Sequence, residues 1–240
     1  QALTSRDRYQ LFQPESVRVE PPYVDLREAI INNRLEVFLQ PLWDIRSGSV
    51  IGAESLARWH SDVHGAISPT DFVLLAEQTG LIESLTRWSV NTTLRHAAAA
   101  RARGQHLRFS INLSPRVFHE PGLVEQFRNA VAIWDVPATD IVLEVTESSV
   151  MEDPSLSAIV LGQLRDHGFG ISIDDFGIGY SSFAYLKRFP VDGLKIDRSF
   201  VGAIETDPAA AIITRATIAL GRSLGLTVLA EGVETEAQAA

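Results

Sequence analysis

The chain of 240 residues contains no cysteine, so it has neither a disulfide framework nor a thiolate metal site. Any bound metal must therefore be held by oxygen or imidazole ligands. No apolar run approaches the roughly 18–20 residues that a membrane span needs, and no signal peptide is visible. These absences favour a cytoplasmic domain that makes no membrane contact of its own.

Positive charge is also scarce, because 21 Lys and Arg stand against 30 Asp and Glu, which gives a net charge of −9. Nucleic-acid polymers bind to clusters of Lys and Arg, so the composition argues against such a partner. A small phosphate-bearing ligand stays compatible if a metal cation lies between it and an acidic pocket. Since residue 1 is Gln1 and Met151 is the only methionine, we expect the sequence to be a piece of a longer protein.

Short β-branched runs alternate with longer helical patterns along the chain. Segments 36–45 and 50–59 flank the polar turn RSGS and predict a hairpin. Further strands are expected at 107–113, 140–147, 169–176, 191–197 and 225–232. Helices are expected at 68–80, 82–102, 122–134, 155–167, 180–188 and 208–223. Apolar strands separated by helices indicate parallel strands that are buried on both faces.

Polar side chains fall at or near the carboxyl ends of six predicted strands. They are Glu54, Asn112, Glu144, Asp174, Lys195 and Glu231. In a TIM-type (β/α)8 barrel these ends converge on one rim, where such barrels hold their active sites. An open doubly wound sheet is the alternative, but it would spread the residues along an edge. The size suits one barrel over residues 25–240, with residues 1–24 as a linker or lead-in and an eighth strand expected beyond residue 240.

Two adjacent carboxylates, Asp174 and Asp175, stand where one predicted strand ends. Like charges ~4 Å apart repel by roughly 4 kcal/mol at an effective dielectric of 20, and three rim glutamates add to this. Either pKa values rise or divalent cations neutralise the cluster, and an amide with several carboxylates suits Mg²⁺ or Mn²⁺. Two such ions form the clamp used for in-line displacement at phosphorus, with Lys195 available to hold water or offset charge. The pattern predicts a two-metal phosphoester hydrolase.

Seven ordered motifs carry a more specific resemblance: GAESLARW, SPTDFVLLAEQTGLI, INLSP, LEVTES, DDFGIGYSS, LKIDRSF and AEGVET. In order and spacing they resemble the EAL-domain cyclic di-GMP phosphodiesterases, from about Leu39 to Gln238. The resemblance implies a (β/α)8-type barrel whose second strand runs antiparallel to the rest. It also implies that two Mg²⁺ or Mn²⁺ ions support hydrolysis of one phosphodiester of cyclic di-GMP, giving linear pGpG. A homodimer, fused to N-terminal signalling domains in a bacterial signalling protein, is expected on the same basis.

The resemblance assigns a metal-binding or catalytic role to each rim residue. The ligands of the first metal would be Glu54, Asn112, Glu144 and Asp174. The ligands of the second metal would be Asp174, Asp175 and Glu231, with Asp174 bridging both ions. Lys195 would contact the hydrolytic water, so the catalytic set comprises Lys195, Glu54, Asp174 and Asp175.

Four further residues receive supporting roles from the resemblance. Gln40 and Arg58 would meet the substrate, and an arginine suits a phosphate oxygen. Glu147 would anchor the loop after Asp175, and Glu234 would support the side of the second metal.

Three departures from the family pattern bear on activity. Ser55 replaces the usual Ala, but strand alternation points its side chain away from the metal, so little effect is expected. Ile178 replaces the usual Thr in the loop that shapes the metal site. The family's last strand, which carries a Gln near the site, is expected beyond residue 240, so this Gln is not assigned to a residue of the sequence. Besides the active enzyme, two alternatives stay open: a degenerate receptor that binds cyclic di-GMP without cleaving it, and a barrel hydrolase for another phosphodiester.

Overall fold

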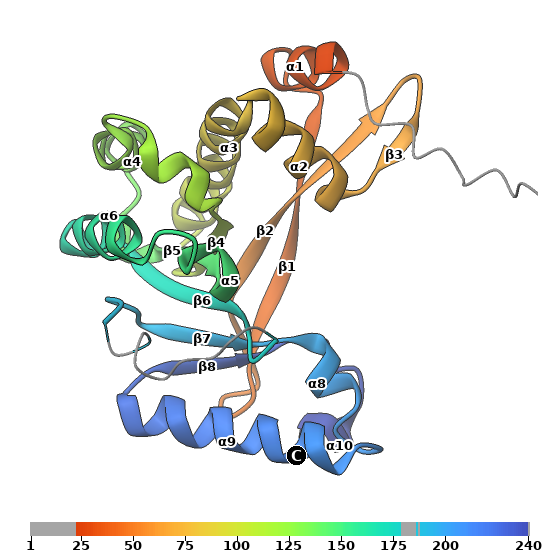
Figure 1. Cartoon of the computed structure of the whole chain (residues 1–240). Coiled ribbons are helices and arrows are strands. Elements are labelled where there is room, and N and C mark those ends of the chain that lie inside the picture. Colours follow the sequence, from red (N-terminus) through yellow and green to blue (C-terminus); the bar gives the residue numbers. More distant parts are fainter. Residues whose placement is uncertain (1–22, 179–185, 187, 240) are drawn as a thin grey trace, which may run out of the picture.

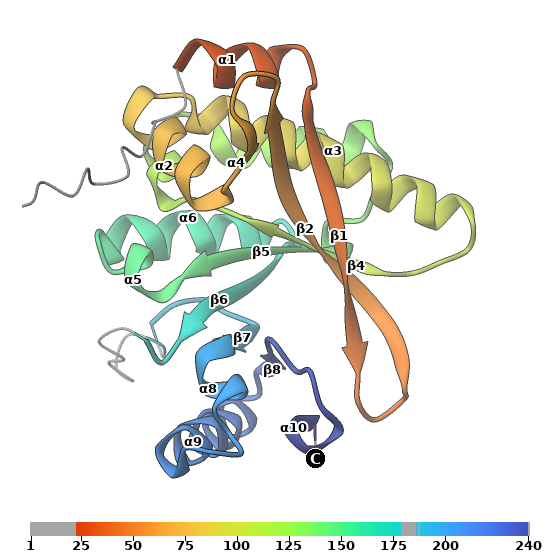
Figure 2. The same cartoon turned by 90° about the vertical axis from the view of Figure 1, so that its right-hand side faces the viewer.

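The computed structural model describes residues 23–178, 186 and 188–239. A single curled sheet forms its centre, and helices pack along the outer face of that sheet (Figures 1 and 2). Within the described part of the chain, no helix combines the length and apolar character needed to cross a membrane.

The sheet follows the chain without any reversal of strand order. Its main path is β1-β2-β4-β5-β6-β7-β8, and the short β3 pairs with β2. The strands are β1 (Leu35–Asp44), β2 (Ser49–Ser61), β3 (Gly65–Ile67), β4 (Arg108–Asn112), β5 (Ile141–Thr146), β6 (Gly170–Phe176), β7 (Gly193–Ile196) and β8 (Thr227–Ala230). A doubly wound sheet would reverse its order at a switch point. The sequential order and the curl confirm the TIM-type barrel and exclude the open-sheet alternative.

Helices connect the parallel strands. They are α1 (Tyr23–Ile31), α2 (Pro69–Thr79), α3 (Ile82–Ala102), α4 (Leu123–Ile133), α5 (Glu147–Val150), α6 (Pro154–Asp166), α8 (Arg198–Gly202), α9 (Pro208–Leu224) and α10 (Glu236–Ala239), with 3₁₀ turns η1 (Pro115–His119) and η2 (Ala138–Asp140). Their ends follow local chemistry: α2 begins at Pro69 and ends at Gly80, whose φ of 74° lets its N–H bond Ala76 O. Most of the helix predicted at 180–188 lies outside the described residues.

The antiparallel strand near the N-terminus is β1. It pairs antiparallel with β2, whereas β2 pairs parallel with β4. The expectation that the second strand runs against the others is therefore wrong. A short turn joins β1 to β2 and forces opposite directions, while the crossover through α2 and α3 is long enough to bring β4 back parallel to β2.

The central parallel strands β4 to β7 are largely buried on both faces, as their continuous apolar runs predict, whereas β8 is only partly buried. All four residues of β7 are buried, and one of them is Lys195. Its neighbour two positions earlier is Gly193, where an added Cβ would lie 3.2 Å from the Ser172 hydroxyl of β6. Small side chains in this layer of the barrel leave room for a buried lysine above them.

Candidate active site

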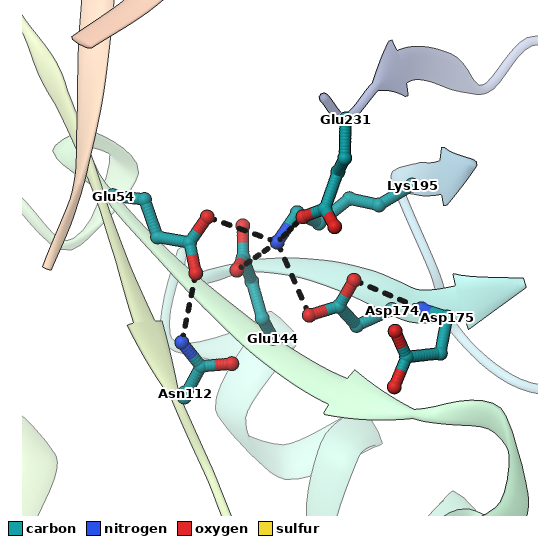
Figure 3. Close-up of polar contacts among 7 residues, drawn as sticks. All are labelled: Glu54, Asn112, Glu144, Asp174, Asp175, Lys195 and Glu231. Carbon is teal, nitrogen blue, oxygen red and sulfur yellow. Dashed lines mark hydrogen bonds and ion pairs between the residues drawn. The ribbon is translucent and has the colours of Figure 1, made fainter. Parts of the chain in front are cut away.

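The structure brings all six predicted rim residues together (Figure 3). Most lie at or near the carboxyl ends of their strands, whereas Glu54 lies within β2, one residue before its ladder with β4 ends. Five of them come from β2, β4, β5, β6 and β7, and Glu231 follows β8 directly. Strand register explains the convergence, because Asn112 is aligned with Glu144 and Thr146 with Asp174. Residues that are far apart in the sequence therefore lie close together at this rim.

Lys195 occupies the middle of the cluster and is 1% exposed. Its Nζ lies 3.1 Å from Glu54 Oε2, 2.7 Å from Glu144 Oε2, 3.1 Å from Asp174 Oδ2 and 2.6 Å from Glu231 Oε1. Burial alone disfavours the ammonium form, but the surrounding carboxylates outweigh it and raise the pKa of Lys195 above its ordinary value. Lys195 is therefore a fixed cation across the physiological pH range.

A backbone irregularity places both members of the Asp pair at the site. Successive side chains of a regular strand point to opposite faces, which would send one carboxylate away. The ladder between β6 and β7 shifts register between Ile173 and Phe176, and Asp175 has a left-handed φ of 53°. The Asp175 N–H donates to Asp174 Oδ1 at 2.8 Å within this bend. Aspartate tolerates this conformation better than most residues, so the bend fits the sequence.

The carboxylates form two overlapping groups that share Asp174. Oxygens of Glu54, Glu144 and Asp174 lie within 4.8 Å of one another, and so do oxygens of Asp174, Asp175 and Glu231. We call them the first and second triads. Asn112 Nδ2 donates to Glu54 Oε1 at 2.9 Å, which places an amide beside the first triad. The ligand atoms are hard oxygen donors, and their combined negative charge exceeds what one lysine neutralises. Such a set suits a divalent cation such as Mg²⁺ or Mn²⁺.

Burial and mutual repulsion raise the pKa values of three carboxyl groups in the metal-free centre. Burial raises the pKa of Glu144 to about 7; Lys195 opposes this rise, while Glu54 and Asp174 add to it. Burial likewise raises the pKa values of Asp175 and Glu231. Because metal ligands must be deprotonated, divalent ions and protons compete for the same oxygens here.

The contribution of Glu144 to metal-free stability is expected to fall as the pH rises. The folded pKa of Glu144, about 7, lies above its ordinary value of 4.5, so its favourable contribution is present below pH 4.5 and is lost as the pH rises toward 7. Glu144→Gln removes this titration, and thermal unfolding in EDTA should increasingly favour the variant over the wild type between about pH 5 and pH 8. A difference in melting temperature that does not change with pH would contradict this expectation.

The loop after Asp175 begins close to Glu147. The Gly177 N–H donates to Glu147 Oε2 at 3.2 Å, so this contact lies where the resemblance expects it. Gly177 has a φ of 101°, and a Cβ there would lie 3.2 Å from the Phe200 ring, so both conformation and space call for glycine. Ile178 follows with a side chain that is 60% exposed. The anchoring role of Glu147 stays a prediction.

The two expected substrate residues lie on the strand hairpin that carries Glu54, whereas Glu234 lies after β8. Gln40 of β1 is paired directly with Glu54, so both side chains lie on one face of the hairpin. Arg58 is four residues after Glu54 on that same face, with its guanidinium carbon 5.7 Å from the centre of the Phe38 ring. Glu234 is exposed before α10, and within the described residues neither triad includes it.

Asp197 also belongs to this centre, although sequence reasoning did not select it. It is 8% exposed, accepts a hydrogen bond from the Ser199 N–H at 2.8 Å as the N-cap of α8, and contributes to the raised pKa of Asp175. The missed signal is its position two residues after Lys195, just past the end of β7.

Ser55 points away from the carboxylates into a buried position, and its hydroxyl has no partner among the described residues. Ser55→Ala is therefore expected to stabilise the fold by ~1 kcal/mol, or about 2–4 °C in melting temperature, without changing activity. Ser61→Ala is the matched control on the same strand, because the buried Ser61 hydroxyl accepts the N–H groups of Val63 and His64. Calorimetry should show opposite signs for the two variants, and a destabilised Ser55→Ala would contradict the expectation.

The fold and the centre together define a TIM-like α/β barrel whose carboxyl rim holds an acidic cluster that could bind metal. The family model of the EAL domain matches residues 24–240. The chain belongs to the EAL-domain family, which confirms the resemblance seen in its motifs.

Relatives and solved structures agree with this assignment. The chain is 44% identical over 215 residues to the bifunctional diguanylate cyclase/cyclic di-GMP phosphodiesterase MucR of Pseudomonas aeruginosa, covering 89% of this chain and 31% of that protein. It is 35% identical over 234 residues to the cyclic di-GMP phosphodiesterase PdeR of Escherichia coli, covering 96% and 35%. A solved structure of the PaMucR phosphodiesterase with c-di-GMP superposes with a TM-score of 0.83 at 44% identity, covering 90% of this chain and 87% of that one. The chain spans about a third of the length of these curated relatives.

Proposed function

We propose that this domain hydrolyses one phosphodiester bond of cyclic di-GMP to linear pGpG, with two Mg²⁺ or Mn²⁺ ions. The observation that carries the proposal is the pair of carboxylate triads that share Asp174 around the buried Lys195. Support comes from MucR and PdeR, whose names include this activity, and from the solved complex of PaMucR with c-di-GMP.

The residues of the site would have two roles in the reaction, metal binding and positioning of the attacking water. The first ion would be held by Glu54, Asn112, Glu144 and Asp174, and the second by Asp174, Asp175 and Glu231. When bound, such ions supply an activated water and Lewis-acid stabilisation of the phosphoryl oxygens. Lys195, with Nζ between the two triads, would hold the attacking water and offset negative charge in the transition state.

Four further residues would bind the substrate or support the centre. Gln40 and Arg58 lie on the face of the β1–β2 hairpin that carries Glu54, where the guanidinium can meet a phosphate oxygen. Glu147 would fix the loop after Asp175 through Gly177, and Glu234 would support the second-metal side. A homodimer, a fusion to N-terminal signalling domains, a cytoplasmic location and the division into residues 1–24 and 25–240 also remain proposals.

The decisive experiment incubates the domain with cyclic di-GMP and follows pGpG by chromatography. Mg²⁺ and Mn²⁺ should support cleavage, EDTA should abolish it, and Ca²⁺ should support it poorly because its longer bonds and looser geometry misplace the water. Full activity after exhaustive chelation would overturn the proposal. Tight binding of cyclic di-GMP without any pGpG would instead identify the domain as a receptor.

Ile178→Thr is expected to raise activity modestly, mainly at limiting metal concentration. A threonine hydroxyl could form one more hydrogen bond in the loop, adding on the order of 1 kcal/mol to the form that holds Asp175, which corresponds to about fivefold in rate at most. Initial rates should be compared at limiting and at saturating Mg²⁺. A gain of several orders of magnitude would mean that Ile178 disables the site, contrary to the proposal of an active enzyme.

A further inference from the structure

Helix α2 joins the strand that carries Glu54 to the segment that follows β4. On one side, the buried rings of Phe72 in α2 and Trp59 in β2 pack edge to face, with centroids 6.1 Å apart. On the other side, Glu77 in the last turn of α2 accepts a hydrogen bond from the Ser114 hydroxyl at 2.7 Å. The helix therefore spans the place where β2 and β4 separate.

Glu77, Ser114 and Arg116 form a small network that we call the α2 bracket. Ser114 caps η1, since its Oγ accepts the Arg116 N–H at 3.3 Å while the same hydroxyl donates to Glu77 Oε1. Arg116 Nε lies 3.3 Å from the other oxygen, Glu77 Oε2. The ion pair with the half-exposed arginine contributes little, but the bond from Ser114 to a carboxylate is charge-assisted. Both carboxylate oxygens of Glu77 thus bind side chains of the turn after β4, one to Ser114 and the other to Arg116.

This turn follows Asn112 directly, on the side where the strand has lost its pairing with β2. The ladder between β2 and β4 ends at the pair Ser55 and Ile111, one residue before Asn112. Asn112 itself is exposed, and among the described residues its side-chain amide bonds Glu54 Oε1, at 2.9 Å. On the β5 side Asn112 stays paired with Glu144, and the next N–H, that of Leu113, bonds Glu144 O at 2.8 Å. On the β2 side no ladder pair holds it, so there its position depends on the turn that follows.

We propose that Glu77 is a positioning residue of the metal centre. Through Ser114 it holds the end of β4 so that the Asn112 amide stays at the distance from Glu54 at which both can bind one ion. The proposal rests on the metal-dependent function proposed above. It assigns to Glu77 no contact with metal or substrate.

The test compares Glu77→Gln with Asp140→Asn. Asp140 forms a 2.8 Å ion pair with Arg101 and is 21% exposed, against 20% for Glu77, but it lies just before β5, at the opposite end of the strands. Titration calorimetry with Mn²⁺ should show roughly tenfold weaker binding for Glu77→Gln and unchanged binding for Asp140→Asn, although both variants lose some thermal stability. Turnover of Glu77→Gln at saturating metal should stay within about twofold of the wild type, because the ligands themselves are intact.

Ser114→Ala provides a second route that leaves the charge of Glu77 in place. It should weaken Mn²⁺ binding in the same direction, and the double variant should be no worse than Glu77→Gln alone, because both act through one bond. Equal Mn²⁺ binding by Glu77→Gln, Ser114→Ala and Asp140→Asn would overturn the proposal. A wild type that binds Mn²⁺ without cleaving cyclic di-GMP would overturn only the proposed function, and one that binds no Mn²⁺ would overturn both.

Discussion

Asp175→Asn is expected to reduce cleavage of cyclic di-GMP by roughly three orders of magnitude, equivalent to about 4 kcal/mol of transition-state stabilisation, while the fold stays intact. The variant removes a charged ligand that belongs to the second triad alone. Asparagine also tolerates the left-handed φ of 53° at this position, so the bend in β6 should persist. Near-normal turnover in a variant that has lost metal binding would contradict the assignment.

Asp175→Ala is the matched control for this variant. Both variants lose the carboxylate, but alanine is strained in the left-handed conformation by about 1–2 kcal/mol. The alanine variant should therefore unfold at a lower temperature than the asparagine variant at equal loss of activity. The same loss of activity is expected for Glu54→Ala, which removes a ligand of the first triad. Glu54→Ala and Asp175→Ala each remove negative charge from a repulsive cluster. The metal-free protein should therefore tolerate the loss of either carboxylate.

Lys195→Met should separate binding from catalysis. The variant keeps the length of the side chain but leaves four carboxylates without the cation that they share, and breaking a buried ion pair costs about 3–5 kcal/mol. Metal-free unfolding should shift to lower temperature accordingly, and Mn²⁺ should restore much of the loss because it supplies positive charge to the same oxygens.

The kinetic signature of Lys195→Met should be a rate loss of roughly 10²–10³ with metal and substrate binding retained, as for removal of a single transition-state donor. Binding can be measured with cyclic di-GMP in Ca²⁺, and rate with Mg²⁺. If affinity and rate fell by the same factor, Lys195 would be a binding residue instead.

Sequence reasoning identified the rim because strand ends are local features. The runs that predicted β4, β5, β6 and β7 each carry a polar residue at or near the carboxyl end, and parallel strands in a barrel bring such ends together. Asp174 and Asp175 stood out for the same reason. Strand alternation predicted that the Ser55 side chain faces away from Glu54, and the structure shows that Ser55 is buried.

Features that depend on tertiary contacts were missed or wrong. The three-residue strand β3 exists through pairing with β2, and no pattern of its own marks Gly65–Ile67. The left-handed turn at Asp175 cannot be read from a sequence in which most aspartates are extended or helical. The bond between Glu77 and Ser114 joins positions 37 residues apart, so only the packing of α2 over the strands reveals it.

Asp174 is the one carboxylate common to both triads, and this gives the proposed metal pair a thermodynamic linkage. An ion in one triad neutralises part of the charge that attracts an ion to the other, so the two affinities oppose each other by equal and reciprocal amounts. The domain should then fill one position at low metal and the second only at higher concentration, which calorimetry would show as two separated binding steps. Turnover would follow the weaker step. The concentration of divalent cation would thus control the rate in a graded way, because both ions share the Asp174 carboxylate. Binding of two ions in one non-cooperative step would argue against this linkage.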